Sequence, residues 1–147
     1  MKKLLVASIG LALMATTSVV AAPGAPLSYV QVRYVGSSNI GWEAISDSMP
    51  STIQNHGGAQ LRVLTVEVGY GTSRIAKING TTLPSSANYQ TIAFCGSNFL
   101  TPCSAGQTIV GYSRYWNLDG YQGGPFYYQT TSINSPLNTM SDTLNIL

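Results

Sequence analysis

Apolar and polar side chains alternate along much of the chain, and this alternation predicts β-strands. Successive side chains of a strand point to opposite faces, so a period of two separates the faces of a sheet. The strongest pattern is in residues 61–70. One face there carries Leu61, Val63, Thr65 and Glu67, and the other carries Arg62, Leu64, Val66, Val68 and Tyr70. We therefore expect a strand in this stretch.

The same period recurs at near-regular intervals. Residues 27–36 predict a half-buried strand, with Val30, Val32 and Tyr34 on one face and Tyr29, Gln31 and Arg33 on the other. Within residues 74–83, Asn79-Gly80 separates two β-compatible runs and predicts a tight hairpin turn. The remaining strand candidates are residues 89–95, 107–116, 124–131 and 141–147.

Residues 37–58 lack a clear period, and a short helical turn over residues 42–45 is the local structure expected there. Helical periodicity is otherwise almost missing. The pattern is typical of an all-β, single-domain antiparallel β-sandwich or barrel of about six to eight strands.

The first residues resemble a secretory leader. Lys2 and Lys3 precede an apolar run that ends near Ala15 and gives way to small residues. We expect residues 1–21 to be a signal peptide, removed after Ala21, and residues 22–147 to be one secreted β domain. The sequence does not distinguish an extracellular from a periplasmic destination.

Charge excludes two classes of partner. The sequence contains seven Lys and Arg against five Asp and Glu, so removal of Lys2 and Lys3 with the leader gives a chain with no net charge. A neutral chain has no electrostatic footprint for nucleic acid or an anionic membrane surface. No later apolar run reaches the roughly 20 residues of a transmembrane segment. The expected partner is an unknown protein or glycan.

Cys95 and Cys103 are the two cysteines of the sequence, and they flank the stretch GSNFLTP. In an exported protein such a pair predicts a disulfide bond. A Cys₄ or Cys₂His₂ zinc site is excluded by count, because His56 is the single histidine. We expect neither a metal nor a cofactor.

Aromatic residues supply the first functional hypothesis. Tyr and Trp combine a large apolar ring with a polar tip and are enriched at binding surfaces. Tyr112 and Trp116 share one predicted strand face while Tyr115 points the other way, so one subset should be exposed. With Trp42 and Tyr121, these residues predict a non-enzymatic domain that binds a protein, glycan or envelope ligand. The ligand-binding candidates are Trp42, Tyr112, Trp116 and Tyr121.

The alternative is a small secreted hydrolase or toxin. Glu43 and His56 lie with Trp42 and Asp47 in the aperiodic segment, and functional residues concentrate in loops. His56 is the natural general base, and Glu43 could serve as an acid. No G-x-S-x-G nucleophile motif accompanies them. Glu43 and His56 are therefore weak catalytic candidates.

Three stretches together resemble a known family. They are PLSYVQVRYVGSSNIGWEAIS, CGSNFLTPC and TTSINSPLNTMSDTLNI. The resemblance is to the YolA-like family of small exported bacterial proteins of unknown function. It implies a single extracellular or periplasmic domain, and it assigns no functional residue.

Overall fold

The computed structural model describes residues 24–147, so the predicted signal peptide lies outside the described residues. Within these residues, one 3₁₀ turn, Ser85–Ala87, accompanies secondary structure that is otherwise all β. The strands are β1 (Tyr29–Ser37), β2 (Gly41–Ala44), β3 (Leu61–Val68), β4 (Gly71–Ile78), β5 (Thr81–Thr82), β6 (Asn88–Phe94), β7 (Gly111–Asn117), β8 (Gly124–Ser132) and β9 (Thr139–Ile146).

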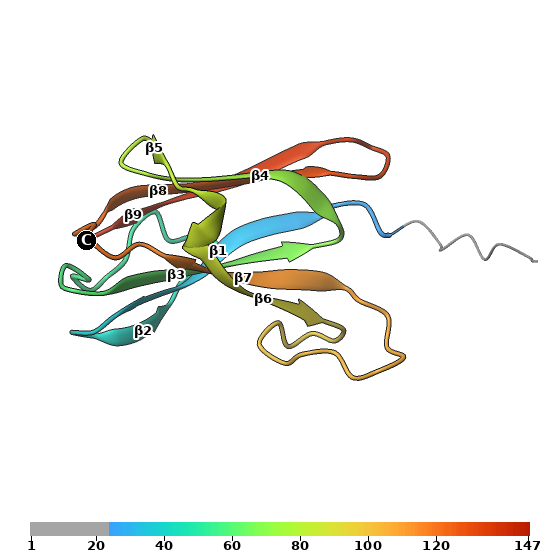
Figure 1. Cartoon of the computed structure of the whole chain (residues 1–147), viewed down its shortest axis with the longest axis horizontal. Coiled ribbons are helices and arrows are strands. Elements are labelled where there is room, and N and C mark those ends of the chain that lie inside the picture. The colour runs from blue at the N-terminus through green and yellow to red at the C-terminus, as the bar shows by residue number, and fades with distance from the viewer. Residues whose placement is uncertain (1–23) are drawn as a thin grey trace, which may run out of the picture.

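These strands form two antiparallel sheets that face each other (Figure 1). The five-stranded sheet has the order β2-β1-β3-β7-β6, and the four-stranded sheet has the order β5-β4-β8-β9. The expected antiparallel sandwich is confirmed. The two short strands β2 and β5 raise the number beyond the six to eight expected.

The helical turn expected over residues 42–45 is wrong. Residues Gly41–Ala44 form β2, which pairs with β1 so that Trp42 lies opposite Gly36. A positive φ of 81° at Gly41 lets the chain turn back directly after β1. The expected turn at Asn79-Gly80 is confirmed, and both residues have positive φ, as a type I′ hairpin requires.

The interior between the sheets is built from alternate positions of the strands. The two predicted faces of β3 are confirmed, because Leu61 and Val63 belong to the core whereas Arg62 lies on the other side. Large side chains of the four-stranded sheet form the other half of the core. They are Ile78, Phe126, Tyr128, Leu144 and Ile146.

A carboxylate lies between the two sheets. Glu67 of β3 is 1% exposed, and its Oε1 accepts hydrogen bonds from Arg114 of β7 and Arg74 of β4, with Nη2–Oε1 distances of 2.8 and 3.1 Å. Its Oε2 accepts the Tyr128 hydroxyl of β8 at 2.8 Å. Burial and the neighbouring carboxylate raise the pKa of Tyr128 far above its ordinary value, so the phenol remains a donor. The Glu67 cluster thus joins both sheets.

Two tryptophans on opposite faces of one sheet allow a direct test. Trp116 is 4% exposed in the core and donates from Nε1 to Thr65 Oγ1 at 2.9 Å, whereas Trp42 is 51% exposed. We expect Trp116→Ala to lower the free energy of unfolding by about 3–5 kcal/mol. We expect Trp42→Ala to cost about 1 kcal/mol or less. Urea denaturation of both variants measures the difference, and equal losses would contradict the assigned faces.

Candidate functional site

The outer face of the five-stranded sheet carries a row of aromatic rings. Neighbouring ring centroids are 6.2 Å apart for Phe99 and Tyr34, 6.4 Å for Tyr34 and Trp42, 6.1 Å for Trp42 and Tyr115, and 6.0 Å for Tyr115 and Tyr89. These spacings lie within the range of favourable aromatic pairs. We call these five residues the aromatic row. It crosses the sheet from β2 to β6.

A β-bulge in β1 puts Tyr34 into this row. Val32 pairs with Thr65 and Tyr34 pairs with Leu64, so Arg33 is an extra residue without a partner in β3. An inserted residue reverses the alternation that follows it. Tyr34 therefore lies opposite to Val30 and Val32, and the expectation that the three share a face is wrong.

A second bulge does the same on the edge strand β6. Asn88 pairs with Trp116 and Gln90 pairs with Tyr115, which leaves Tyr89 as the inserted residue. The Tyr89 ring lies against Tyr115, and the Arg62 guanidinium lies 5.5 Å from its centroid. Both bulges thus add an aromatic ring to the row.

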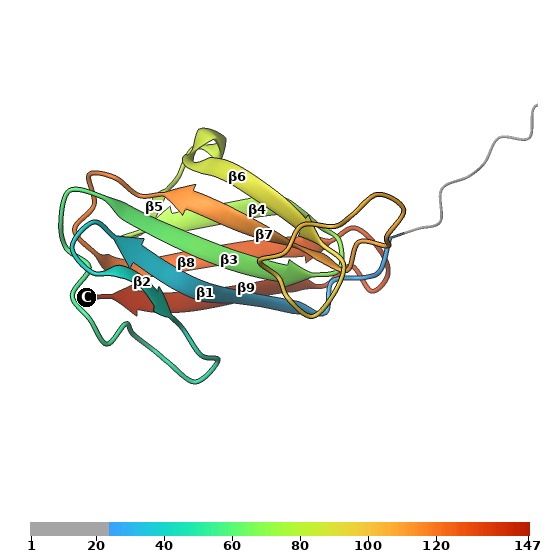
Figure 2. The same ribbon diagram turned by 90° about the horizontal axis from the view of Figure 1, so that it is seen from below.

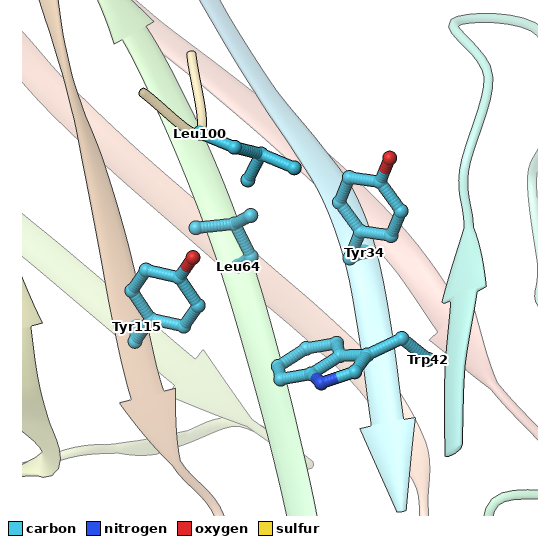
Figure 3. Close-up of a pocket in the computed structure, with 5 residues that line it drawn as sticks. All are labelled: Tyr34, Trp42, Leu64, Leu100 and Tyr115. Carbon is cyan, nitrogen blue, oxygen red and sulfur yellow. The ribbon is translucent and has the colours of Figure 1, made fainter. Parts of the chain in front are cut away.

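A missing side chain makes room for Trp42. Gly36 lies opposite Trp42 in the β1–β2 hairpin, and a Cβ at Gly36 would lie 2.7 Å from the indole Cε3. That distance is far below a van der Waals contact. With glycine there, the indole lies across β1 towards the middle of the sheet (Figure 3).

Three rings of the row line a pocket of about 220 Å³. Tyr34 and Tyr115 stand on opposite sides of Leu64, with Trp42 at one end and Leu100 at the other (Figure 3). Leu64 of the central strand β3 is 1% exposed and forms the floor. The volume is below that of ordinary small-molecule sites. The pocket can therefore hold one ring of a larger ligand.

The loop closed by the disulfide forms the end of this pocket at which Leu100 lies. Cys95 and Cys103 are bonded, with their Cα atoms 5.2 Å apart, which confirms the expected disulfide. The loop folds over the outer face at one end of the sheet (Figure 2). Ser113 Oγ donates to the Phe99 carbonyl at 2.5 Å and fixes the tip that carries Phe99 and Leu100.

Charged groups near the row are already paired. Arg33 lies 5.3 Å from the Phe99 centroid and bonds Asp47 at 3.1 Å, and Arg62 pairs with Asp119. Burial raises the pKa of Tyr115, so this phenol is neutral at physiological pH. The pocket therefore offers apolar surface and neutral polar tips rather than free charge.

The family model described as Domain of unknown function (DUF4879) matches residues 22–146. The chain belongs to this family. No curated protein matches it. Membership of an uncharacterised family agrees with what the sequence resemblance implies, and it assigns no activity to the DUF4879 domain.

The structure separates the predicted binding residues of this DUF4879 domain. Trp42 lies in the aromatic row, whereas Trp116, the other tryptophan among the binding candidates, lies in the core and does not reach the surface. Tyr112 is on the same inner side as Trp116 and packs against Tyr70, and Tyr121 packs partly buried against the core. The alternation in β7 left open which of its two faces is buried, and the structure places the partly buried Tyr115 on the outer face.

The two weak catalytic candidates, Glu43 and His56, are brought together. His56 Nε2 lies 2.9 Å from Glu43 Oε2, and the side chains are 0% and 7% exposed. The backbone N–H groups of Ile53 and Gln54 donate to Glu43 at 2.7 and 3.1 Å. Burial alone would raise the pKa of Glu43, but these bonds and the one from His56 outweigh it and lower the pKa.

Residues 24–147 contain no group of three or more His, Cys, Asp or Glu arranged to hold a metal ion. Over the same residues no helix is long and apolar enough to cross a membrane.

Acid should weaken the fold through Glu43. Because the folded-state pKa is lowered, the carboxylate stabilises the fold above its ordinary value of 4.5, and this contribution is lost as the pH falls through the lower folded value. We expect the urea midpoint to fall on acidification below about pH 4.5. Glu43→Gln should show a smaller fall, while the Asp119 contribution remains in both proteins. If the urea midpoints of the wild-type protein and of Glu43→Gln depended on pH in the same way, this role of Glu43 would be contradicted.

Loss of the disulfide should loosen the loop but spare the sandwich. We expect Cys95→Ser to lower the free energy of unfolding by about 2–3 kcal/mol, since the closed ring is small. The fold should persist, because a domain of this size buries about two thirds of its surface. Calorimetry and far-ultraviolet circular dichroism check both points, with Ser97→Ala in the same loop as the control. An unfolded variant at room temperature would contradict the second point.

Proposed function

We propose that this domain binds a neutral glycan and holds one ring of it in the pocket of the aromatic row. The observation that carries the proposal is the pocket itself: two phenols, one indole and two leucine side chains converge on a space of about 220 Å³. Convergent aromatic side chains around a concavity are the common arrangement of a ligand site.

The polar tips of the pocket favour a sugar over a purely apolar ligand. Within residues 24–147 the hydroxyls of Tyr34 and Tyr115 have no side-chain hydrogen-bond partner. A sugar ring presents apolar C–H faces to aromatic rings and hydroxyls at its edge. An apolar side chain would cover both phenols and leave their hydroxyls unpaired, which costs about 1–3 kcal/mol for each buried group.

Charge favours a neutral ligand. Arg33 and Arg62, the cations at the two ends of the row, are each paired with an aspartate. An acidic ligand would have to displace Asp47 or Asp119 to gain a bond. The neutral glycan requires no such exchange.

The site of action proposed here is outside the cytoplasm, either extracellular or periplasmic. The predicted leader over residues 1–21 is one support. The Cys95–Cys103 disulfide is another, because such bonds persist in oxidising compartments. A YolA-like relationship, with its exported bacterial members, fits the same proposal.

The hydrolase in which Glu43 acts directly on a substrate has less support. Both carboxylate oxygens of Glu43 accept N–H donors from Ile53, Gln54 and His56. The carboxylate is thus bound within the protein and directed away from a ligand. The aromatic row is separate from this pair and needs neither residue.

Substitutions in the row test the proposal. A glycan array with the purified mature domain should identify a bound neutral oligosaccharide, and calorimetric titration then measures the affinity. We expect Trp42→Ala and Tyr115→Ala each to weaken binding roughly 10-fold or more, or about 1.4 kcal/mol. Tyr127→Ala changes a ring on the opposite sheet and should leave the affinity unchanged. Affinity that survives both row substitutions would overturn the proposal.

Removal of a single hydroxyl separates a sugar from an apolar ligand. We expect Tyr34→Phe and Tyr115→Phe to weaken glycan binding while leaving the pocket shape intact, because only the hydrogen bond is lost. Titration of each variant with the same oligosaccharide measures the effect. Unchanged or tighter binding would show that the pocket recognises apolar surface, as in a protein partner.

A further inference from the structure

Three side chains at the β1–β2 turn form a hydrogen-bonded series. Ser37 Oγ lies 3.1 Å from His56 Nδ1, and His56 Nε2 lies 2.9 Å from Glu43 Oε2. The order is hydroxyl, imidazole, carboxylate. The order is that of the triads by which hydrolases activate a serine, but the two imidazole nitrogens are exchanged, with Nδ1 facing the serine and Nε2 facing the carboxylate. Ser37 belongs to no motif in the sequence.

When His56 is neutral, its two partners fix the direction of these hydrogen bonds. Glu43 Oε2 needs a proton from Nε2, since the carboxylate offers acceptors only. With the proton on Nε2, the lone pair of Nδ1 accepts from Ser37. Ser37 Oγ also accepts the Ile40 N–H at 3.3 Å, so its own proton is free to point at His56. Each bond is consistent with the same imidazole tautomer.

Burial gives the three groups different access to solvent. His56 is fully buried and Glu43 nearly so, whereas Ser37 is partly exposed. Ser37 lines a separate pocket of about 150 Å³, together with Gly36, Trp42, Gln60 and Arg62. Ser37 is therefore the partly exposed member of the series, while its base is shielded from water.

We propose that Ser37 is a nucleophile that hydrolyses small carboxylic esters, with His56 as its general base and Glu43 as a positioning residue. The pocket volume limits the substrate to a short acyl group. Gln60 lines the same pocket and has a side-chain amide of the kind that stabilises an oxyanion. Ser37, His56 and Glu43 do not belong to the aromatic row, although Trp42 lines both pockets.

The reaction proceeds in two balanced halves. Ser37 Oγ forms a bond to the ester carbonyl carbon while its proton moves to His56 Nδ1, and the alcohol leaves with that proton. In the second half water attacks the acyl-serine and gives one proton to Nδ1. The carboxylic acid departs, and the proton returns to Ser37 Oγ. Nothing is oxidised or reduced.

A covalent serine probe tests the nucleophile directly. The purified mature domain is incubated with a small fluorophosphonate, and the adduct is located by peptide mass spectrometry. We expect Ser37 to be labelled at least about 10-fold faster than Ser38, an adjacent exposed serine that has no hydrogen bond to His56. Ser37→Ala should abolish the adduct and the hydrolysis of p-nitrophenyl acetate. Ser38→Ala should retain both.

The role of Glu43 as a positioning residue is tested by the rate at which Ser37 is labelled. We expect Glu43→Gln to slow labelling of Ser37 by about 10-fold or more, measured at neutral pH where circular dichroism shows the variant folded. Equal labelling of Ser37 and Ser38 in the wild-type protein, or no adduct at either, would overturn the proposal. In that case the three residues would only hold the turn. The wild-type comparison remains decisive if a variant fails to fold.

Discussion

The buried carboxylate of Glu67 constrains the whole sandwich. A charge between two sheets is tolerated only when donors surround it, and here the donors come from Arg114 in one sheet and from Arg74 and Tyr128 in the other. The two sheets can slide or rotate only by breaking these bonds. The inner positions of β3 and β7 are thereby committed to the interior, and their alternate positions are left for the outer face, where Leu64 and Tyr115 lie.

The alternation along β3 was predictable from the sequence because no residue interrupts its pairing. The same reasoning failed for Tyr34, since a bulge at Arg33 is a property of the register between two strands and has no signature in the alternation of one strand. For β7 the alternation correctly placed Trp116 and Tyr115 on opposite faces, but it did not show which of the two faces is buried. Only the position of Glu67 and the core decides that Trp116 is inside and Tyr115 is outside.

The contacts within the candidate sites join residues that are far apart in the sequence, so they could not be predicted from it. The disulfide followed from the predicted leader and from the cysteine count, both of which can be read directly from the sequence. The contact of His56 with Ser37 spans 19 residues and depends on the path of the aperiodic loop, which no period predicts. The proximity of Trp42 to Tyr115 depends equally on the order of strands in the sheet. Sequence patterns assign residues to faces, whereas pairing order decides which faces meet.

The pairing of charges has a consequence for the kinetics of association. Within residues 24–147 all four arginines lie in ion pairs, and Lys77 lies 5.9 Å from the Tyr127 ring centroid. Little long-range field remains to steer a ligand towards the sheet. Encounter then proceeds at the unsteered rate of about 10⁵–10⁶ M⁻¹s⁻¹, nearly independent of ionic strength. For the proposed glycan-binding module, the lifetime of the complex rather than long-range attraction would then set selectivity.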